Sequence, residues 1–246
     1  VRAPARDGVF LGGKLTLRQG DGYRAAVDAV LLAASLRLKP GDRAAEFGCN
    51  AGAALLSAAW LNRDAAFTGV ESDHEAARLA ADNISANAME DRVRVVEADA
   101  LAWRPGEQLD SVFFNPPFFD DAARLRAPAP GKRGAWINEA GLAAWIAAGL
   151  KRLREGGRLT VIQRADRLGD ILAALEGKAG GVAVLPVHPR ADAPAKRVVV
   201  AAVKTSKAPL RVLPGLVLHA RGGGAYMPET DAILRGEAFT ALAHAS

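Results

Sequence analysis

The stretch Leu109-Asp110-Ser111-Val112-Phe113-Phe114-Asn115-Pro116-Pro117-Phe118 predicts a buried strand that ends at a ligand site. Its apolar run favours the strand, and two consecutive prolines fix φ twice and remove two backbone donors, so the strand stops there. An amide, a stiff turn and an aromatic ring then stand at the carboxyl end of the strand, where open α/β sheets bind ligands. The amide oxygen and a proline carbonyl can accept hydrogen bonds from an NH2 group, and Phe118 can stack on a planar ring. Taken alone, the four residues are equally consistent with a simple proline turn.

Short apolar runs alternate with helical patterns from Arg43 onward. This rhythm predicts an α/β fold with a mostly parallel sheet and helices on both faces, finished by an antiparallel pair of strands at 182–187 and 198–203. The expected strands are 43–47, 66–70, 93–96, 111–114, 158–163, 182–187, 198–203 and 216–219. The expected helices are 25–38, 53–61, 74–88, 138–155, a segment capped by Asp166 that runs to Glu176, and 230–234.

A length of 246 residues, half of them hydrophobic, suits one large α/β domain. We expect a single domain over residues 1–246, with a hairpin around Gly12-Gly13 and a helix in 1–40, the core sheet in 41–205 and a C-terminal extension in 206–246. No long apolar run is present, so no membrane span is expected, and the cytoplasm is the expected location. Cys49 and the four histidines show no ligand spacing, so no metal is expected.

The charge is unevenly distributed along the chain. Residues 1–40 carry 7 Lys/Arg and 3 Asp/Glu, residues 41–117 carry 6 and 13, and residues 118–246 carry 19 and 11. Basic flanks suggest a polyanionic partner such as nucleic acid, and the alternative is ordinary solvated faces. Residues 119–135 are too long and too rich in proline and glycine for a packed connection. The basic residues of this loop, expected either in solvent or at phosphates, are Arg124, Arg126, Lys132 and Arg133.

Polar groups follow four successive expected strands. The segment Glu46-Phe47-Gly48-Cys49-Asn50-Ala51-Gly52 joins the first strand to its helix, and glycines there let the backbone approach a ligand closely. Glu71 ends the second strand, where a carboxylate can accept the hydroxyls of a ribose. Asp99 follows the third strand and can accept from an adenine amine, and Asn115 follows the fourth. We expect the four groups to face one crevice.

These spacings and the tetrapeptide together resemble the class I S-adenosylmethionine-dependent methyltransferases, and Asn-Pro-Pro-Phe resembles those that methylate an exocyclic or amide nitrogen. Residues 23–34, 196–198, 209–214 and 226–229 are similar to the bacterial tRNA1(Val) adenine-37 N6-methyltransferase group. The resemblance implies a Rossmann-like seven-stranded methyltransferase sheet with an antiparallel final strand, S-adenosyl-L-methionine as cofactor, and RNA, namely tRNA, as partner of a monomer or weak homodimer. Asn50 replaces the family's central glycine; because Asn tolerates positive φ, we expect the turn to survive, with its side chain crowding the ligand.

The resemblance also implies roles for individual residues. The implied cofactor-binding residues are Glu46, Gly48, Asn50 and Gly52 at the methionine moiety, Glu71 at the ribose, Asp99 at the adenine, and Asp28 and Asn115 beside them. The implied catalytic residues are Asn115, Pro116, Pro117 and Phe118. The implied substrate-binding residues are Phe118, Tyr23, Arg24, Arg124, Arg126, Lys132 and Arg133.

Methylation of an adenine N6 amine in tRNA is the leading hypothesis. Guanine-N2 RNA methyltransferases share Asn-Pro-Pro-Phe, and glutamine-N5 protein methyltransferases carry a related tetrapeptide that ends in Tyr, so both stay open, as does a DNA adenine. A chain that binds the cofactor to support a partner, without catalysis, is the alternative from another class. Asn50 favours that alternative, and the intact tetrapeptide argues against it.

Overall fold

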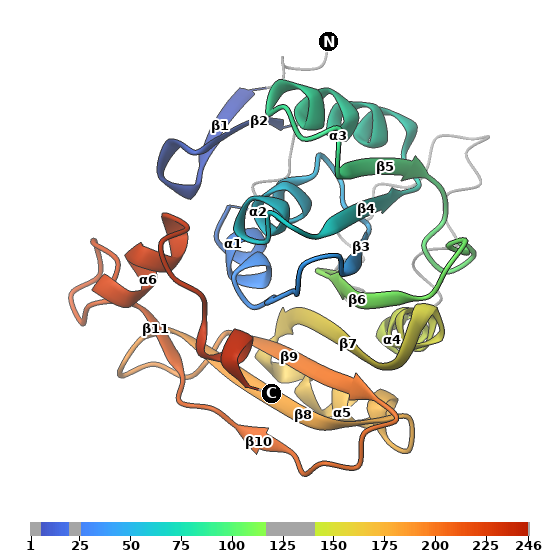
Figure 1. The fold of residues 1–246 in the computed structure, drawn as a ribbon. Coiled ribbons are helices and arrows are strands. Elements are labelled where there is room, and N and C mark those ends of the chain that lie inside the picture. The colour runs from blue at the N-terminus through green and yellow to red at the C-terminus, as the bar shows by residue number, and fades with distance from the viewer. Residues whose placement is uncertain (1–5, 20–25, 117–140, 246) are drawn as a thin grey trace, which may run out of the picture.

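The computed structural model describes residues 6–19, 26–116 and 141–245, which form a central sheet flanked by helices and a separate two-stranded hairpin (Figure 1). The strands are β1 Arg6–Phe10, β2 Leu15–Gln19, β3 Arg43–Phe47, β4 Ala66–Glu71, β5 Val93–Glu97, β6 Leu109–Phe114, β7 Leu153–Arg164, β8 Ala179–Arg190, β9 Arg197–Lys204, β10 Arg211–Val212 and β11 Leu216–His219. The helices are α1 Ala26–Ala33, α2 Ala53–Leu61, α3 His74–Ala86, α4 Gly141–Arg152, α5 Leu168–Leu175 and α6 Pro228–Leu234. Short 3-10 turns are η1 Leu11–Gly13, η3 Ala165–Arg167 and η4 Ala241–His244.

The central sheet is Rossmann-like, with strand order β10-β8-β9-β7-β6-β3-β4-β5. Strands β3 to β7 pair in parallel, and β9 is antiparallel to both β7 and β8. The predicted mostly parallel sheet with an antiparallel final strand is therefore confirmed. The count of seven strands was wrong, because β10 and β11 also pair in parallel with β8 and bring the described sheet to nine. β10 is two exposed residues long, which is too short for a periodic signal.

Apolar side chains fill both faces of the sheet. Phe113 points into a cluster with residues of α1, α2 and α3, and Phe114 points into a second cluster with residues of α4 and α5. Successive residues of a strand point to opposite faces, so this one pair of phenylalanines serves both layers. Helices therefore cover both faces, as the alternation of strands and helices predicted.

Two helices end earlier than the sequence predicts, because tertiary contacts hold the residues that follow them. α1 ends at Ala33 rather than residue 38, because the following turn is held from outside: the Thr240 N–H bonds to the Ala34 carbonyl, and the Leu38 N–H bonds to Asn62 Oδ1. The helix expected to reach 155 ends at Arg152, since Leu153 is buried and already pairs with Leu109 as part of β7.

Asp166 does not cap the next helix. α5 begins after Arg167, which makes no side-chain cap, and the Asp166 carboxylate instead pairs with the Arg164 guanidinium two residues earlier. That pair lowers the pKa of Asp166. The prediction of a capping aspartate was wrong because a nearby cation competes with the backbone N–H groups for the same carboxylate.

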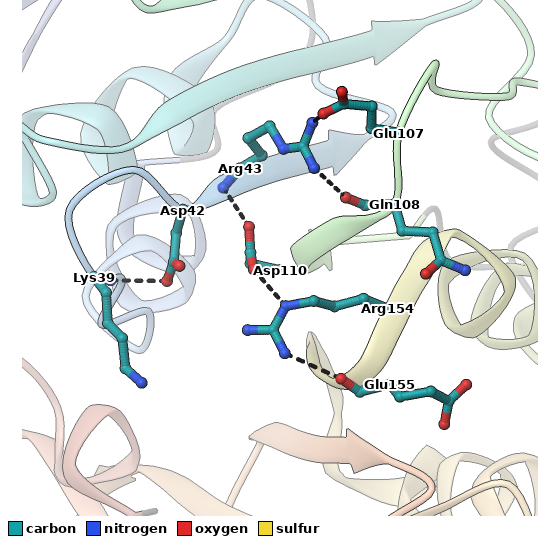
Figure 2. Close-up of polar contacts among 8 residues, drawn as sticks. All are labelled: Lys39, Asp42, Arg43, Glu107, Gln108, Asp110, Arg154 and Glu155. Carbon is teal, nitrogen blue, oxygen red and sulfur yellow. Dashed lines mark hydrogen bonds and ion pairs between the residues drawn. The ribbon is translucent and has the colours of Figure 1, made fainter.

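Charged groups tie together the amino ends of three parallel strands (Figure 2). Asp110 of β6 accepts from the Arg43 N–H of β3 at 2.8 Å and from Arg154 Nε of β7 at 2.6 Å. Partial burial alone would raise the pKa of Asp110, but these donors outweigh it and the pKa is lowered. Arg43 also pairs with Glu107 and donates to the Gln108 carbonyl. This edge of the sheet is thus stabilised by ion pairs, whereas the carboxyl edge carries the candidate site.

Candidate functional site

The candidate site lies at the carboxyl ends of β3, β4 and β6. Phe47 of β3 pairs with Val70 on one side and with Phe114 on the other. The residues that follow these three, Gly48, Glu71 and Asn115, therefore leave the sheet at the same level. This register brings the turn, the carboxylate and the amide to one edge, as the spacing predicted.

The turn after β3 requires left-handed backbone at Gly48, Asn50 and Gly52, whose φ values are 64°, 48° and 86°. A Cβ on Gly48 would lie 2.9 Å from the ring of Trp145, so the position excludes any side chain. Asn50 Oδ1 accepts from the Ala51 N–H at 2.7 Å, which folds the amide back onto its own turn. The expectation that the turn survives with asparagine is confirmed, and the residue's local hydrogen bond compensates for its left-handed φ.

Glu71 is held in place by backbone donors. Its Oε2 accepts from the Asn50 N–H at 2.9 Å, and Oε1 accepts from the Ser72 N–H at 2.8 Å and the Asp73 N–H at 2.9 Å. Oε1 also accepts from the Ser72 hydroxyl at 3.5 Å, whereas Oε2 accepts from the Asn50 N–H and from no other donor that the structure places on it. Each carboxylate oxygen has about two acceptor positions, so Oε2 has room for about one ligand hydroxyl. Glu71 both fixes the turn through Asn50 and presents a carboxylate beside it.

A pocket opens between this turn and helix α1. Its described lining consists of Gln19, Ala29, Glu46, Gly48, Cys49, Asn50, Ala51, Ala53, Ala54 and Asn115. Asn115 is half-buried there, and Pro116, which follows it, is buried. Four sequence-predicted site residues thus line one pocket, namely Glu46, Gly48, Asn50 and Asn115. Glu71 adjoins the pocket, because its carboxylate accepts from the Asn50 N–H.

Glu46 is the unusual group in this lining. It is 4% exposed, and its Oε2 has no hydrogen-bond partner among the described residues. Burial raises the pKa of Glu46 well above its usual range, the Leu55 N–H at the start of α2 opposes that shift, and repulsion by Glu71 adds to it. A buried carboxyl with an unsatisfied oxygen beside a pocket would gain from a cationic or hydrogen-donating ligand.

Besides Glu71, three predicted cofactor residues lie outside the described lining of the pocket, namely Asp28, Asp99 and Gly52. The Asp28 carboxylate on α1 accepts from Arg197 Nε at 3.0 Å, and its neighbour Ala29 faces the pocket instead. Asp99 closes a tight turn after β5, where Oδ1 accepts from the Leu101 N–H at 2.9 Å. Gly52 is the last residue of the turn and the N-cap of α2.

Eight predicted site residues lie outside the described residues: Tyr23, Arg24, Pro117, Phe118, Arg124, Arg126, Lys132 and Arg133. Sequence reasoning missed Gln19 and Ala29, which reach the pocket from the hairpin and from α1. It also missed Trp145, whose ring underlies Gly48. Neither an isolated Gln nor an Ala within an apolar helix carries a local signal, so only the tertiary contacts reveal them.

Within residues 6–19, 26–116 and 141–245, no three His, Cys, Asp or Glu side chains lie close enough together to hold a metal ion. Over the same ranges, each helix is too short or too polar to cross a bilayer.

Comparison with known proteins identifies the family. Residues 25–185 match the sequence profile described as methyltransferase small domain. A tRNA1(Val) (adenine(37)-N6)-methyltransferase from Shewanella amazonensis is 34% identical over 111 residues, which cover 44% of this chain and 47% of that protein. A ribosomal RNA large subunit methyltransferase G from Pseudomonas entomophila is 37% identical over 76 residues, covering 31% of this chain and 20% of that protein.

A solved structure from Agrobacterium tumefaciens, described as a predicted O-methyltransferase, superimposes with a TM-score of 0.70 and 28% identity, covering 86% of this chain and 97% of that one. The matches to the two curated relatives span about half of one and a fifth of the other. The family profile, in contrast, covers well over half of this chain, from α1 into β8, and so includes the whole turn and Asn115. The chain therefore belongs to the methyltransferase small domain family.

Proposed function

We propose that this chain is an S-adenosyl-L-methionine-dependent N-methyltransferase that acts on the N6 amine of an adenine in tRNA. The observation that carries the proposal is the meeting of Asn115 with Glu46 and the left-handed turn in one pocket. An amide at a strand end suits an NH2 substrate, and the tRNA adenine N6-methyltransferase of Shewanella amazonensis, 34% identical over the matched region, supports adenine and tRNA. The cytoplasm and a monomeric or weakly dimeric state remain predictions.

The lining of the pocket fits this cofactor. S-adenosylmethionine, when bound, supplies a methyl group on a positively charged sulfonium and also carries an ammonium group. Glu46 offers an unsatisfied buried oxygen to such a cation, and Glu71 offers its remaining acceptor position to a ribose hydroxyl. The left-handed turn lets the backbone approach the ligand closely.

Asn115 and Pro116 would position the target amine. The lone pair of an aromatic amine is delocalised into its ring, so the amine is a weak nucleophile. Hydrogen bonds from its two protons to Asn115 Oδ1 and the Pro116 carbonyl oxygen would favour a pyramidal nitrogen and aim its lone pair at the methyl group. Catalysis would then rest on positioning and preorganised dipoles, and the proton would leave to water after transfer.

RNA would be held by the basic flanks. The acidic middle of the chain would repel phosphates, so we assign the RNA contacts to the basic flanks, with Phe118 against the extruded base. The assigned residues are Tyr23, Arg24, Arg124, Arg126, Lys132 and Arg133. Asp99 and Asp28 would border the adenosine end of the cofactor. An unpaired loop nucleotide can be extruded into such a pocket at low cost.

The test combines binding with product identification. Calorimetric titration should detect S-adenosylmethionine and S-adenosylhomocysteine but not NAD. Transfer of a labelled methyl group to total tRNA, followed by nucleoside mass spectrometry, should yield N6-methyladenosine. Asn115→Leu, which keeps the size but removes the acceptor, should abolish methyl transfer and preserve cofactor binding. Asn115→Asp, which keeps an acceptor oxygen, should retain part of the methyl-transfer activity. Loss of cofactor binding in both variants would make Asn115 structural and overturn its role.

A second candidate is methylation of a guanine N2 amine in ribosomal RNA. The match to the ribosomal RNA large subunit methyltransferase G favours ribosomal RNA, and the Asn-Pro-Pro-Phe tetrapeptide, which guanine-N2 RNA methyltransferases share, is compatible with that amine. The same pocket would accept that amine. Parallel reactions with total tRNA and with ribosomal RNA separate the two: N2-methylguanosine in ribosomal RNA would replace the leading proposal. A methyl group found on ribose oxygen would exclude both and match the description of the Agrobacterium tumefaciens structure instead.

A further inference from the structure

Asn83 within α3 and Asn87, the C-cap that follows this helix, are four residues apart, and both bind strand β2 of the amino-terminal hairpin, which lies beside α3 (Figure 1). Asparagine is unfavourable inside a helix, because its amide competes for backbone groups. Asn83 is also only 1% exposed, so its amide has lost water and needs protein partners.

Each asparagine binds one residue of β2 in both directions. Asn87 accepts from the Thr16 N–H at 3.3 Å and donates to the Thr16 carbonyl at 3.0 Å. Asn83 accepts from the Arg18 N–H at 2.8 Å and donates to the Arg18 carbonyl at 2.9 Å. Thr16 and Arg18 are two residues apart, so their backbone groups point to the same side of the strand. The two amides thus take the place of a neighbouring strand along this edge of the hairpin.

The second amide hydrogen distinguishes the two residues. Asn87 Nδ2 donates to the Asn83 carbonyl at 2.8 Å, so it caps the helix that precedes it. Asn83 Nδ2 donates at 2.8 Å to the carbonyl of Ala51, which belongs to the left-handed turn of the pocket. Of the two, Asn83 therefore joins three segments that are far apart in sequence: the hairpin, α3 and the turn.

This junction sets one wall of the pocket. Gln19 directly follows Arg18 and lines the pocket, and Ala51 lines it too. A single buried amide binds both Arg18 and Ala51, so it fixes the distance between the hairpin wall and the turn. Without that amide, the buried Ala51 carbonyl and the part-buried backbone groups of Arg18 would lose a partner, and the two walls would be free to separate.

We infer that Asn83 is a positioning residue for the cofactor, and that the amino-terminal hairpin, through Gln19, is a wall of the cofactor pocket. The inference rests on the proposed S-adenosylmethionine site. Asn83 acts on that ligand through the Ala51 carbonyl and the hairpin and touches neither the methyl group nor the target amine.

The matched pair for the test is Asn83→Ala and Asn87→Ala. Both remove a two-way bond to the same strand, one from within α3 and one from its C-cap, and only the first releases the turn. We expect both to lower the free energy of unfolding, but only Asn83→Ala to raise the Kd and the KM for S-adenosylmethionine by about tenfold or more, with kcat at saturating cofactor changed far less. Gln19→Ala should raise the Kd while leaving stability nearly unchanged.

A structural readout keeps the inference separate from the proposed function. Hydrogen exchange of the free protein should show faster exchange in residues 48–52 for Asn83→Ala and not for Asn87→Ala. Equal exchange and equal Kd in the two variants would overturn the inference. If Asn83→Ala does not fold, Asn83→Asp serves, because it can still accept from Arg18 but cannot donate to Ala51. Failure of the wild-type protein to bind S-adenosylmethionine would instead refute the proposed function, and the exchange result would still decide whether Asn83 holds the turn.

Discussion

Replacing Glu46 by Gln should make the free protein more stable, and increasingly so as the pH rises. Glu46 is buried, one of its oxygens has no partner among the described residues, and its pKa is raised by burial and by Glu71. Glutamine has nearly the same shape and keeps an oxygen for the Leu55 N–H, but it never carries the buried charge. The comparison therefore isolates the cost of ionising Glu46 inside the fold.

The sign and the size of the effect follow from linkage. Below the ordinary pKa of a glutamate, Glu46 is protonated in both folded and unfolded chains and costs nothing. Above that pKa, the unfolded chain ionises at Glu46 while the folded protein keeps the proton. The free energy of unfolding therefore falls as the pH rises towards and through the raised pKa of Glu46 in the folded state. In that window the difference in unfolding free energy between the Gln variant and wild type should grow by about 1.4 kcal/mol per pH unit.

Urea denaturation from about pH 5 to about pH 8 would measure this difference. Glu176→Gln, at an exposed glutamate that follows α5, accounts for the general effect of removing one negative charge. A difference between Glu46→Gln and wild type that stays constant across this range would refute the assignment of a raised pKa. The same variant should bind S-adenosylmethionine more weakly at high pH, because the sulfonium and ammonium would lose an anionic partner.

Three further predictions concern the turn and the opposite edge. Gly48→Ala should cost about 2 kcal/mol or more of unfolding free energy, because it places a Cβ in left-handed backbone and against an indole ring. Gly106→Ala is the control: nothing lies within 4 Å of its Cβ position, so it should change stability little in the same urea titration. The free energy of unfolding of Asn50→Gly should lie within about 1 kcal/mol of wild type, since glycine keeps the left-handed φ. Asn50→Ala should be less stable than Asn50→Gly, and the reverse order in thermal unfolding would contradict the role given to φ. Arg154→Ala removes a half-exposed pair with Asp110 and should cost about 1 kcal/mol or less without changing the Kd for cofactor; a weakened Kd would mean that the two edges of the sheet are coupled.

The charged groups at the two opposite edges of the sheet thus differ in how fully they are paired. At the amino ends, cations and carboxylates are matched across β3, β6 and β7, as Figure 2 shows for Arg43, Asp110 and Arg154. At the carboxyl ends, Glu46 keeps an unsatisfied oxygen beside a pocket, and Glu71 keeps an acceptor position. Satisfied pairs stabilise strands, whereas unsatisfied buried groups cost stability and are retained where a ligand can use them.

The sequence by itself determined the alternation of strands and helices from β3 to β9 and the edge of the sheet at which Gly48, Glu71 and Asn115 meet. The ranges 43–47, 53–61 and 216–219 match β3, α2 and β11 residue for residue, because apolar periodicity and turn residues act over a few neighbours. The two prolines after Asn115 likewise set the end of β6 from their own covalent geometry.

Only the tertiary structure decided which residues complete the pocket and where several elements end. α1 stops at Ala33 because Thr240, more than 200 positions later, bonds to the next carbonyl. The junction from Asn83 to Ala51 spans 32 positions, and Gln19 reaches the pocket from a separate hairpin. No periodic pattern in the amino-acid sequence predicts such contacts. Each is a single hydrogen bond or a single packed side chain between segments that only the folded sheet brings together. The one local sign was Asn83 inside a helix, where the poor fit of asparagine indicates that the partners of its amide lie elsewhere.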